Sequence, residues 1–150
     1  MEQTTKMLKR LTNLTPGMAE ELKNDPVRPK ISPSKRIGRN KDVFYEMSNE
    51  GEIDAVVCVT YTNDVPTDES NLFDMPGKDI AIFYSVWSNR AGAGRKIIFD
   101  TVEVITNENN NIQRFVTLSP DTKIAERFHL RNGAIVFRTN DNTVNYEYLK

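Results

Sequence analysis

The expected architecture follows from one stretch of the chain, Ile80-Ala81-Ile82-Phe83-Tyr84-Ser85-Val86-Trp87-Ser88-Asn89-Arg90-Ala91-Gly92-Ala93-Gly94-Arg95. Residues 80–87 are almost continuously apolar, which is typical of a strand that is buried on both faces. Small residues then form a loop, and Ile98, Val102 and Ile105 recur on one helical face. Residues 95–105 contain β-branched residues, but their lack of alternation favours a helix over a strand. The stretch therefore predicts a strand, a loop and a helix.

The loop between this strand and this helix is suited to a phosphate group. Small residues let backbone N–H groups approach an anion, and the helix N-terminus adds unpaired donors and the positive end of its dipole. Only Gly-x-Gly is present, so neither a Walker loop nor the dinucleotide-binding fingerprint is satisfied. A purely structural connection is the alternative. The residues expected to bind a phosphate-bearing cofactor are Val86, Ser88, Asn89, Arg90, Ala91, Gly92, Ala93, Gly94, Arg95 and Lys96.

More strands and helices are expected on either side of this stretch. Asp121 is a suitable N-cap, and Gly133 a suitable residue just past the end, of a helix over 122–132. Its buried stripe would consist of Ile124, Ala125 and Phe128. The order α-loop-β-β-β-α-β-α-β-β predicts a single mixed α/β domain over 1–150, with helices flanking a central sheet. The remaining expected elements are helices over 4–14 and 16–23 and strands over 43–47, 53–61, 114–118, 134–138 and 144–148.

The N-terminal segment 1–41 differs in character from the core over 42–150. Spacings of three and four residues predict its first helix, on the residues Met7, Leu8, Leu11 and Leu14. Residues 26–41 hold three prolines and six basic residues, with no acidic residue among them. Proline removes a backbone donor and restricts its neighbour, so regular structure is not expected there. This stretch is either an anion-facing loop or a solvated connection.

Composition excludes several classes of function. The chain carries 20 Lys and Arg against 21 Asp and Glu, so its net charge of −1 gives no overall attraction to nucleic acid or anionic lipid. A single cysteine, Cys58, excludes an internal disulfide framework and a multi-cysteine zinc site. A single histidine excludes a histidine-rich metal site, and we expect no metal. Both Cys58 and Trp87 are expected to serve in packing.

The chain is also expected to have no membrane partner. No apolar run approaches the roughly 20 residues that a membrane helix needs. The N-terminal residues lack the apolar stretch of a signal peptide. These observations predict a reduced, cytoplasmic protein that does not act on nucleic acid.

The only histidine lies in the second segment of interest, residues 124–134. His129 follows Ala125 by four residues, so the two share one helical face, which points inward or toward a cleft. Imidazole is a suitable proton donor near neutral pH. A histidine that is merely packed or exposed is the alternative interpretation.

These two segments, in this order, resemble the Gcn5-related N-acetyltransferase (GNAT) fold. The family's pyrophosphate loop has a Gln/Arg-x-x-Gly-x-Gly/Ala pattern, which Gly92 and Gly94 match, while Asn89 stands at the Gln/Arg position. The family's later helix carries Ala-x-x-x-Tyr-x-x-x-Gly-Phe. Ala125 and Gly133 match that pattern, and His129 stands where the tyrosine is expected.

Three motifs are similar to the catalytic domain of malonyl-CoA decarboxylase, which uses a GNAT-type fold. They are residues 81–86, Thr117-Leu118-Ser119-Pro120 and Arg127-Phe128-His129-Leu130-Arg131-Asn132-Gly133-Ala134, and the resemblance covers about 80–138. It implies that Ser119 and His129 are the catalytic pair. The decarboxylase has a long insertion between the two motifs, whereas here they are ten positions apart. Eight helical residues between them would rise roughly 12 Å, so a direct Ser–His hydrogen bond needs another arrangement.

The resemblance implies an acyl-CoA-dependent enzyme, either an N-acetyltransferase-like acyltransferase or a malonyl-CoA decarboxylase-like lyase. Coenzyme A would be bound as part of the substrate, with its pyrophosphate at 88–96 and with His129 as proton donor. The basic residues of 26–41 would reach the 3′-phosphate. The acceptor is not specified, and pairing through the strands over 134–148 would make a homodimer. The alternative is a non-catalytic GNAT-fold binding module that uses 26–41 for a partner.

Overall fold

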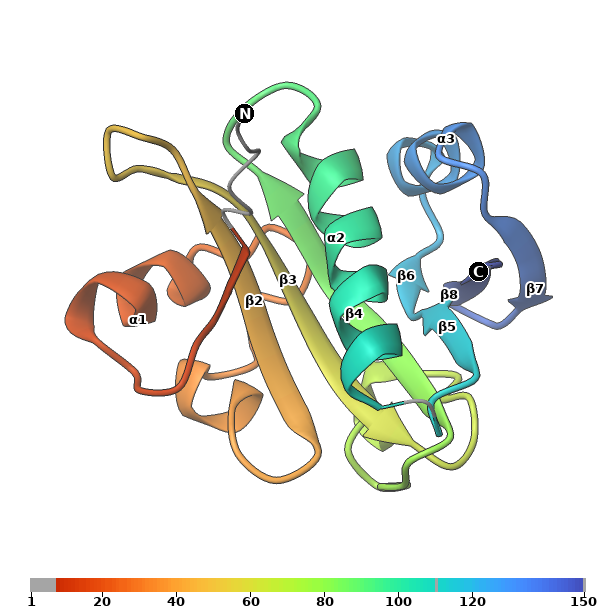
Figure 1. Ribbon diagram of the computed structural model, residues 1–150. Coiled ribbons are helices and arrows are strands. Elements are labelled where there is room, and N and C mark those ends of the chain that lie inside the picture. The colour runs from red at the N-terminus through yellow and green to blue at the C-terminus, as the bar shows by residue number, and fades with distance from the viewer. Residues whose placement is uncertain (1–7, 110, 150) are drawn as a thin grey trace.

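One sheet of eight strands runs through the residues that the computed structural model describes, 8–109 and 111–149 (Figure 1). Its strand order is β1-β2-β3-β4-β5-β8-β6, and β7 pairs with β8. The β4–β5 pair is parallel and the other pairs are antiparallel. The strands are β1 (Leu8–Arg10), β2 (Lys41–Met47), β3 (Ile53–Thr62), β4 (Ile80–Ser88), β5 (Arg114–Thr117), β6 (Ser119–Pro120), β7 (Ile135–Thr139) and β8 (Thr143–Tyr148).

Helices cover both faces of this sheet, so the apolar side chains of the central strands are buried on both sides. Helix α2 (Ala93–Glu108) packs on one face through Ile97, Ile98 and Ile105. Helix α1 (Pro16–Lys23) covers the other face through Met18 and Leu22. The remaining helical elements are α3 (Lys123–Arg131) and the 3-10 helices η1 (Pro33–Arg36) and η2 (Glu69–Asn71). None of the described helices is long and apolar enough to cross a lipid bilayer.

The mixed α/β architecture and its central elements are confirmed. Strand β4 is buried over most of its length, and the residues after it form a helix rather than a strand. The six expected strands are all present, with boundaries shifted by a few residues. Cys58 is fully buried in β3, and Trp87 is buried in β4, as expected for packing residues.

The expected first helix is wrong where the structure describes it. Leu8–Arg10 is a strand that pairs with β2, and the Leu11 N–H donates to the Val43 carbonyl at 2.8 Å. Pairing at the free edge of the sheet therefore overrides the helical spacing of the leucines. The part of that prediction on residues 1–7, including Met7, lies outside the described residues.

The N-terminal end and the buried face of α3 differ from the expectation. Its N-cap is Thr122, whose Oγ1 accepts from the Ala125 N–H at 3.2 Å, and not Asp121. Ile124 is 81% exposed, so it does not belong to a buried stripe.

The C-terminal end of α3 is as expected. Gly133 has a φ of +97°, which a side chain would strain, and its N–H donates to Leu130 O. The Ala134 N–H donates to His129 O at 3.0 Å. This pair of bonds is the Schellman motif, which ends the helix and leads the chain into β7.

Candidate functional site

The sheet opens between β4 and β5. Their pairing ends at Phe83 and Thr117, after which the Leu118 N–H donates to Phe83 O at 3.1 Å. Strand β4 continues to Ser88, whereas the chain after Leu118 enters β6 and pairs with β8. The two strands therefore separate toward the end of the molecule that holds the β4–α2 loop and α3 (Figure 1).

An extra residue in β4 adds to this opening. Cys58 of β3 lies opposite Ser85, but the next residue, Val59, lies opposite Phe83. Tyr84 is therefore a bulge residue, which locally bends the strand and turns its backbone groups out of the ladder.

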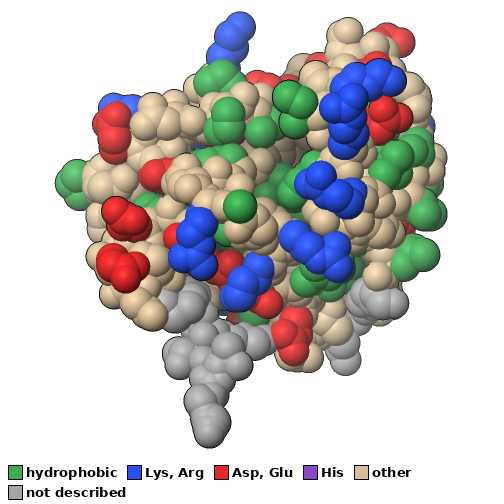
Figure 2. Space-filling model, turned by 90° about the horizontal axis from the view of Figure 1, so that it is seen from above, with side chains coloured by type: hydrophobic (Ala, Val, Ile, Leu, Met, Phe, Trp, Pro, Cys, Tyr) green, Lys and Arg blue, Asp and Glu red, His purple; other side chains and the backbone are tan. Residues whose placement is uncertain are grey.

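A cavity of about 520 Å³ occupies the opening between β4, β6, α2 and α3. Among the described residues that line it, there is no Asp, Glu, Lys or Arg. Seen from this end of the molecule, Lys and Arg side chains lie on the outer surface, with Asp and Glu side chains among them (Figure 2). The apolar chamber suits a ligand that has a neutral or desolvated end. The lining residues are Pro26, Val27, Phe83, Tyr84, Ser85, Val86, Trp87, Ser88, Gly94, Leu118, Ser119, Pro120, Thr122, Ile124, Ala125, Phe128 and His129.

His129 projects from α3 into this region and is only 4% exposed. Its Nδ1 lies 2.7 Å from the Tyr148 hydroxyl of β8, and its ring stacks on Tyr146 with centroids 5.0 Å apart. Burial lowers the pKa of His129 to about 4, because the charged imidazolium loses its hydration. The ring is therefore neutral at neutral pH.

The Tyr148 hydroxyl can bond to either tautomer of that neutral ring, because a phenol both donates and accepts. Burial raises the pKa of Tyr148, so its phenol keeps its proton and can donate to Nδ1 of His129. In the tautomer in which it donates, the imidazole proton is on Nε2.

Ser119 lines the same cavity but has a different partner. Its Oγ donates to Thr117 Oγ1 at 2.8 Å, and Thr117 Oγ1 also accepts from the Tyr146 N–H at 3.0 Å. The structure thus brings Ser119 and His129 to one cavity without a direct hydrogen bond between them, in agreement with their spacing along the chain.

Three of the ten residues expected to bind the cofactor line the cavity, namely Val86, Ser88 and Gly94. Gly94 lies close to α3, because a Cβ on it would come within 3.2 Å of the Phe128 ring. Gly92 caps α2 with a φ of +81°, a conformation that favours glycine. The fold itself therefore favours glycine at both positions, whether or not the loop binds a phosphate.

The cationic residues of the loop point in different directions. Arg90 and Lys96, with Ala91, Gly92 and Ala93, line a second pocket of about 320 Å³ on the other side of the α2 N-terminus. Arg90 pairs with Asp54 at 3.5 Å, and Asn89 donates to Glu21 at 3.2 Å. These contacts direct Asn89 and Arg90 away from the cavity.

Lys96 is held by two carboxylates, at 3.1 Å from Glu46 and 2.8 Å from Asp100. Glu46 is itself buried, and burial raises its pKa to about 7. Arg95, in contrast, contacts neutral groups: it donates to Asn132 Oδ1 at 3.1 Å and lies over the Phe99 ring. Arg95 is therefore the better placed cation for a ligand that lies between α2 and α3.

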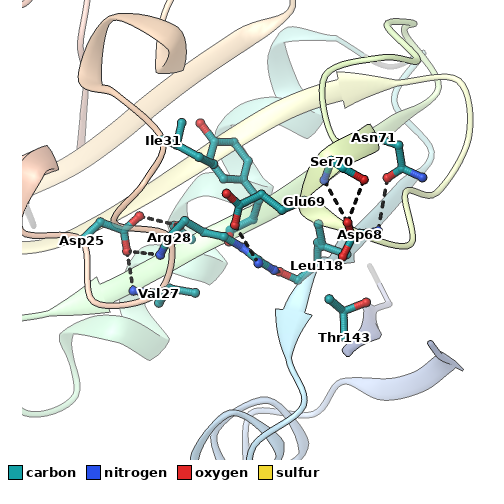
Figure 3. A network of polar contacts seen from close by, with 12 residues as sticks. Asp25, Val27, Arg28, Ile31, Asp68, Glu69, Ser70, Asn71, Leu118 and Thr143 are labelled. Carbon is teal, nitrogen blue, oxygen red and sulfur yellow. Dashed lines mark hydrogen bonds and ion pairs between the residues drawn. The ribbon is translucent and has the colours of Figure 1, made fainter. Parts of the chain in front are cut away.

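Both interpretations of 26–41, an anion-facing loop and a solvated connection, are wrong for two of its arginines. Arg36 is fully buried and pairs with Asp25 at 2.6 Å, while its Nη2 donates to Arg28 O and Ile31 O. Arg28 is also buried and donates to main-chain carbonyls of the sheet (Figure 3). Asp25 immediately precedes this stretch, so the composition of 26–41 by itself gives no sign of the pairing.

Sequence reasoning also missed Tyr146 and Tyr148, which surround His129. The two tyrosines are two positions apart in a predicted strand, so they lie on the same face of it, and this spacing is the feature of the sequence that indicates a shared contact. Thr117 belongs to the same motif as Ser119, but the motif does not indicate that the two side chains are hydrogen-bonded.

No model of a known protein family matches this chain, and no curated protein sequence does. Several solved structures, in contrast, are similar to it. Malonyl-CoA decarboxylase from Cupriavidus metallidurans is similar with a TM-score of 0.72 and 16% identity, over 95% of this chain and 60% of that one. The enzyme from Rhodopseudomonas palustris gives 0.70 and 20%, over 95% and 56%. The N-acetyltransferase PseH of Campylobacter jejuni, in complex with acetyl coenzyme A, gives 0.65 and 12%, over 95% and 97%.

These similarities establish the fold. The chain has the fold shared by GNAT acetyltransferases and malonyl-CoA decarboxylase, as its motifs implied. It spans less than two thirds of the length of the two decarboxylase chains.

Proposed function

We propose that this protein binds an acyl-CoA thioester in the opening between β4 and β5 and decarboxylates a malonyl-type acyl group. One observation carries the proposal: Ser119 and a neutral His129 line one cavity, and no charged side chain of the described part of the chain lines it with them. The structural similarity to a coenzyme A-binding acetyltransferase and to malonyl-CoA decarboxylases supports the acyl-CoA part.

Such a cavity suits the loss of carbon dioxide. A carboxylate that is moved from water into apolar surroundings loses its hydration, and breaking the bond from the α-carbon to the carboxyl group disperses its charge. The electron pair of that bond forms a thioester enolate. Donors that are directed at the enolate oxygen stabilise it more than they stabilise the substrate.

Ser119 and His129 have separate roles in this proposal. The Ser119 hydroxyl turns its proton from Thr117 Oγ1 toward the ligand and holds the carboxylate or the thioester oxygen. His129, with its proton on Nε2, donates a hydrogen bond to the enolate oxygen. As the Nε2 proton passes to the α-carbon, Nδ1 takes the proton of the Tyr148 hydroxyl, so the imidazole stays neutral, and a proton from water then restores the starting state. The Tyr148 hydroxyl keeps the ring in this orientation.

Acyl transfer to an amine is the second candidate. Glu21 lies beside the cavity, where its Oε2 accepts from Trp87 Nε1 at 2.9 Å. A carboxylate in that place would attract an ammonium group and accept the proton that it must lose before the amine attacks the thioester carbon. The Nε2–H of His129 would then hydrogen-bond to the departing thiolate until water protonates it.

The test begins with the melting temperature in the presence of coenzyme A, acetyl-CoA and malonyl-CoA. A ligand at about a hundredfold excess over its dissociation constant should stabilise the protein by ~2.7 kcal/mol. Release of carbon dioxide from malonyl-CoA would support the first candidate, and acetylation of added amines the second. The variant His129→Gln should bind malonyl-CoA yet lose turnover, and unchanged turnover would remove His129 from the mechanism. Absence of any ligand-induced shift contradicts the acyl-CoA site itself.

A further inference from the structure

Arg28 lies at the point where β4 and β5 separate, close to Leu118 and Glu69 (Figure 3). Its Nη2 donates to Leu118 O at 2.8 Å and its Nε to Tyr84 O at 3.4 Å. Its Nη1 lies 3.1 Å from Glu69 Oε1 in η2. One buried side chain therefore joins both sides of the opening to a third segment of the chain.

Both carbonyls need an outside donor because of the way the sheet opens. Tyr84 is the bulge residue of β4, and Leu118 lies where the chain leaves β5 for β6. A buried carbonyl without a donor is strongly unfavourable, and a planar guanidinium presents several donors in a fixed fork. Arg28 thus replaces, across the opening, hydrogen bonds that a neighbouring strand would otherwise supply.

The peptide that carries Arg28 is itself a wall of the cavity. Pro26 and Val27 line the cavity directly. Asp25 fixes this peptide, because its Oδ1 accepts from the Val27 and Arg28 N–H groups at 2.7 and 3.0 Å. Its Oδ2 accepts from Ser85 Oγ of β4 at 2.7 Å. The wall is thus tied to β4 through Asp25 and to both strands through Arg28.

We infer that Arg28 is a positioning residue for the acyl group: it sets the separation of β4 from β6 and holds Pro26 and Val27 against the acyl end of the ligand. This inference rests on the acyl-CoA site proposed above. Arg28 does not line the cavity, so it acts through the wall and the strands rather than by contact. Loss of the guanidinium group should weaken binding of the acyl group and leave binding of the nucleotide part of coenzyme A unchanged.

The test compares Arg28→Met and Arg28→Lys with the wild-type protein and a matched arginine variant. Arg28→Met removes all three polar contacts. Arg28→Lys keeps the charge beside Glu69, but one ammonium group does not reproduce the fork that serves both carbonyls. The control is Arg114→Met, because Arg114 at the opposite end of the β4–β5 pair donates to Glu147 at 2.8 and 2.9 Å. Calorimetry gives the dissociation constants of coenzyme A and of malonyl-CoA for each protein, and thermal unfolding gives its stability.

We expect Arg28→Met to weaken malonyl-CoA binding about tenfold and coenzyme A binding by less than about twofold, together with a lower melting temperature. Arg28→Lys should lower the melting temperature less than Arg28→Met does and still lose about fivefold for malonyl-CoA alone. Arg114→Met should lower the melting temperature and leave the ratio of the two dissociation constants unchanged.

Two results would overturn the role of Arg28 and leave the acyl-CoA site standing. In the first, the Arg28 variants lose the same affinity for coenzyme A as for malonyl-CoA. In the second, the wild type and the variants all bind both ligands with unchanged affinity. If the wild-type protein binds neither ligand, the proposed acyl-CoA site fails and the positioning role is overturned with it.

Discussion

The Nδ1 atom of His129 lies 2.7 Å from the hydroxyl oxygen of Tyr148, and the first residue belongs to α3 while the second belongs to β8. Both side chains are buried. The hydrogen bond orients the imidazole, and burial keeps it uncharged. A neutral, oriented ring is suited to donating from Nε2, and it also makes the stability of the protein depend on pH.

His129 should destabilise the folded protein progressively as the pH falls from 6.5 to about 4. Its pKa is 6.5 without the fold and about 4 within it, so the unfolded chain binds the extra proton in this window. The contribution to stability is complete above pH 6.5 and is lost below about pH 4, and its full size is roughly 3 kcal/mol. Urea unfolding across this range measures it.

A second buried group acts in the opposite sense and must be separated from the first. Burial raises the pKa of Glu46 from 4.5 to about 7, so its contribution is complete below pH 4.5 and is lost as the pH rises to about 7. The wild-type curve therefore contains opposing slopes. The difference between the wild type and His129→Gln isolates the histidine, and a difference that does not vary with pH would contradict the assigned burial effect.

Replacing Gly94 with alanine should destabilise the protein and disturb its ligand site. The new Cβ would lie 3.2 Å from two ring atoms of Phe128, so the ring must move by a few tenths of an ångström. Overpacking of this kind costs about 1–3 kcal/mol. Because Phe128 precedes His129, Gly94→Ala should also reduce malonyl-CoA affinity in a calorimetric titration.

Gly17→Ala is the matched control for that substitution. Gly17 is an exposed residue of α1 with nothing within 4 Å of an added Cβ. Alanine there should leave binding unchanged and stabilise the helix by about 0.5–1 kcal/mol. Equal losses of binding in the two alanine variants would show that the approach of Gly94 to Phe128 has no special role.

The two neighbouring cations of α2 should differ in their effect on coenzyme A binding. Lys96 is paired with Glu46 and Asp100, whereas Arg95 contacts an amide oxygen and an aromatic ring. Arg95→Ala should therefore weaken coenzyme A binding about five- to tenfold, in a manner that fades at high salt. Lys96→Ala should change it less than about twofold. Binding titrations at low and high salt give both values, and the reverse order would contradict this assignment of the phosphate site.

The central part of the fold could be predicted from the sequence because the patterns that indicate it are local. The apolar run of 80–87 and the helical spacing of Ile98 and Ile105 depend on neighbouring residues alone, and both were confirmed. Leu8 and Leu11 gave an equally regular signal that was wrong. Their backbone pairs with β2, a contact between residues far apart in the chain that no local pattern encodes.

The candidate site was only partly predictable for the same reason. Resemblance to known motifs placed Ser119 and His129, and both line the cavity. The partners that orient them come from elsewhere in the chain, as Tyr148 does for His129. Arg28 belonged to a stretch whose charge pointed to the surface, but its donors satisfy carbonyls that only the opened sheet leaves unpaired.

The contacts of Arg28 also bear on the order in which the protein folds. They join residues that are 56 and 90 positions apart, whereas β2 and β3 form a hairpin between neighbouring segments. Closing long loops costs entropy that short ones avoid, and contacts of high sequence separation slow folding. The wall of the cavity is therefore completed late in folding, after the sheet on which it rests has formed.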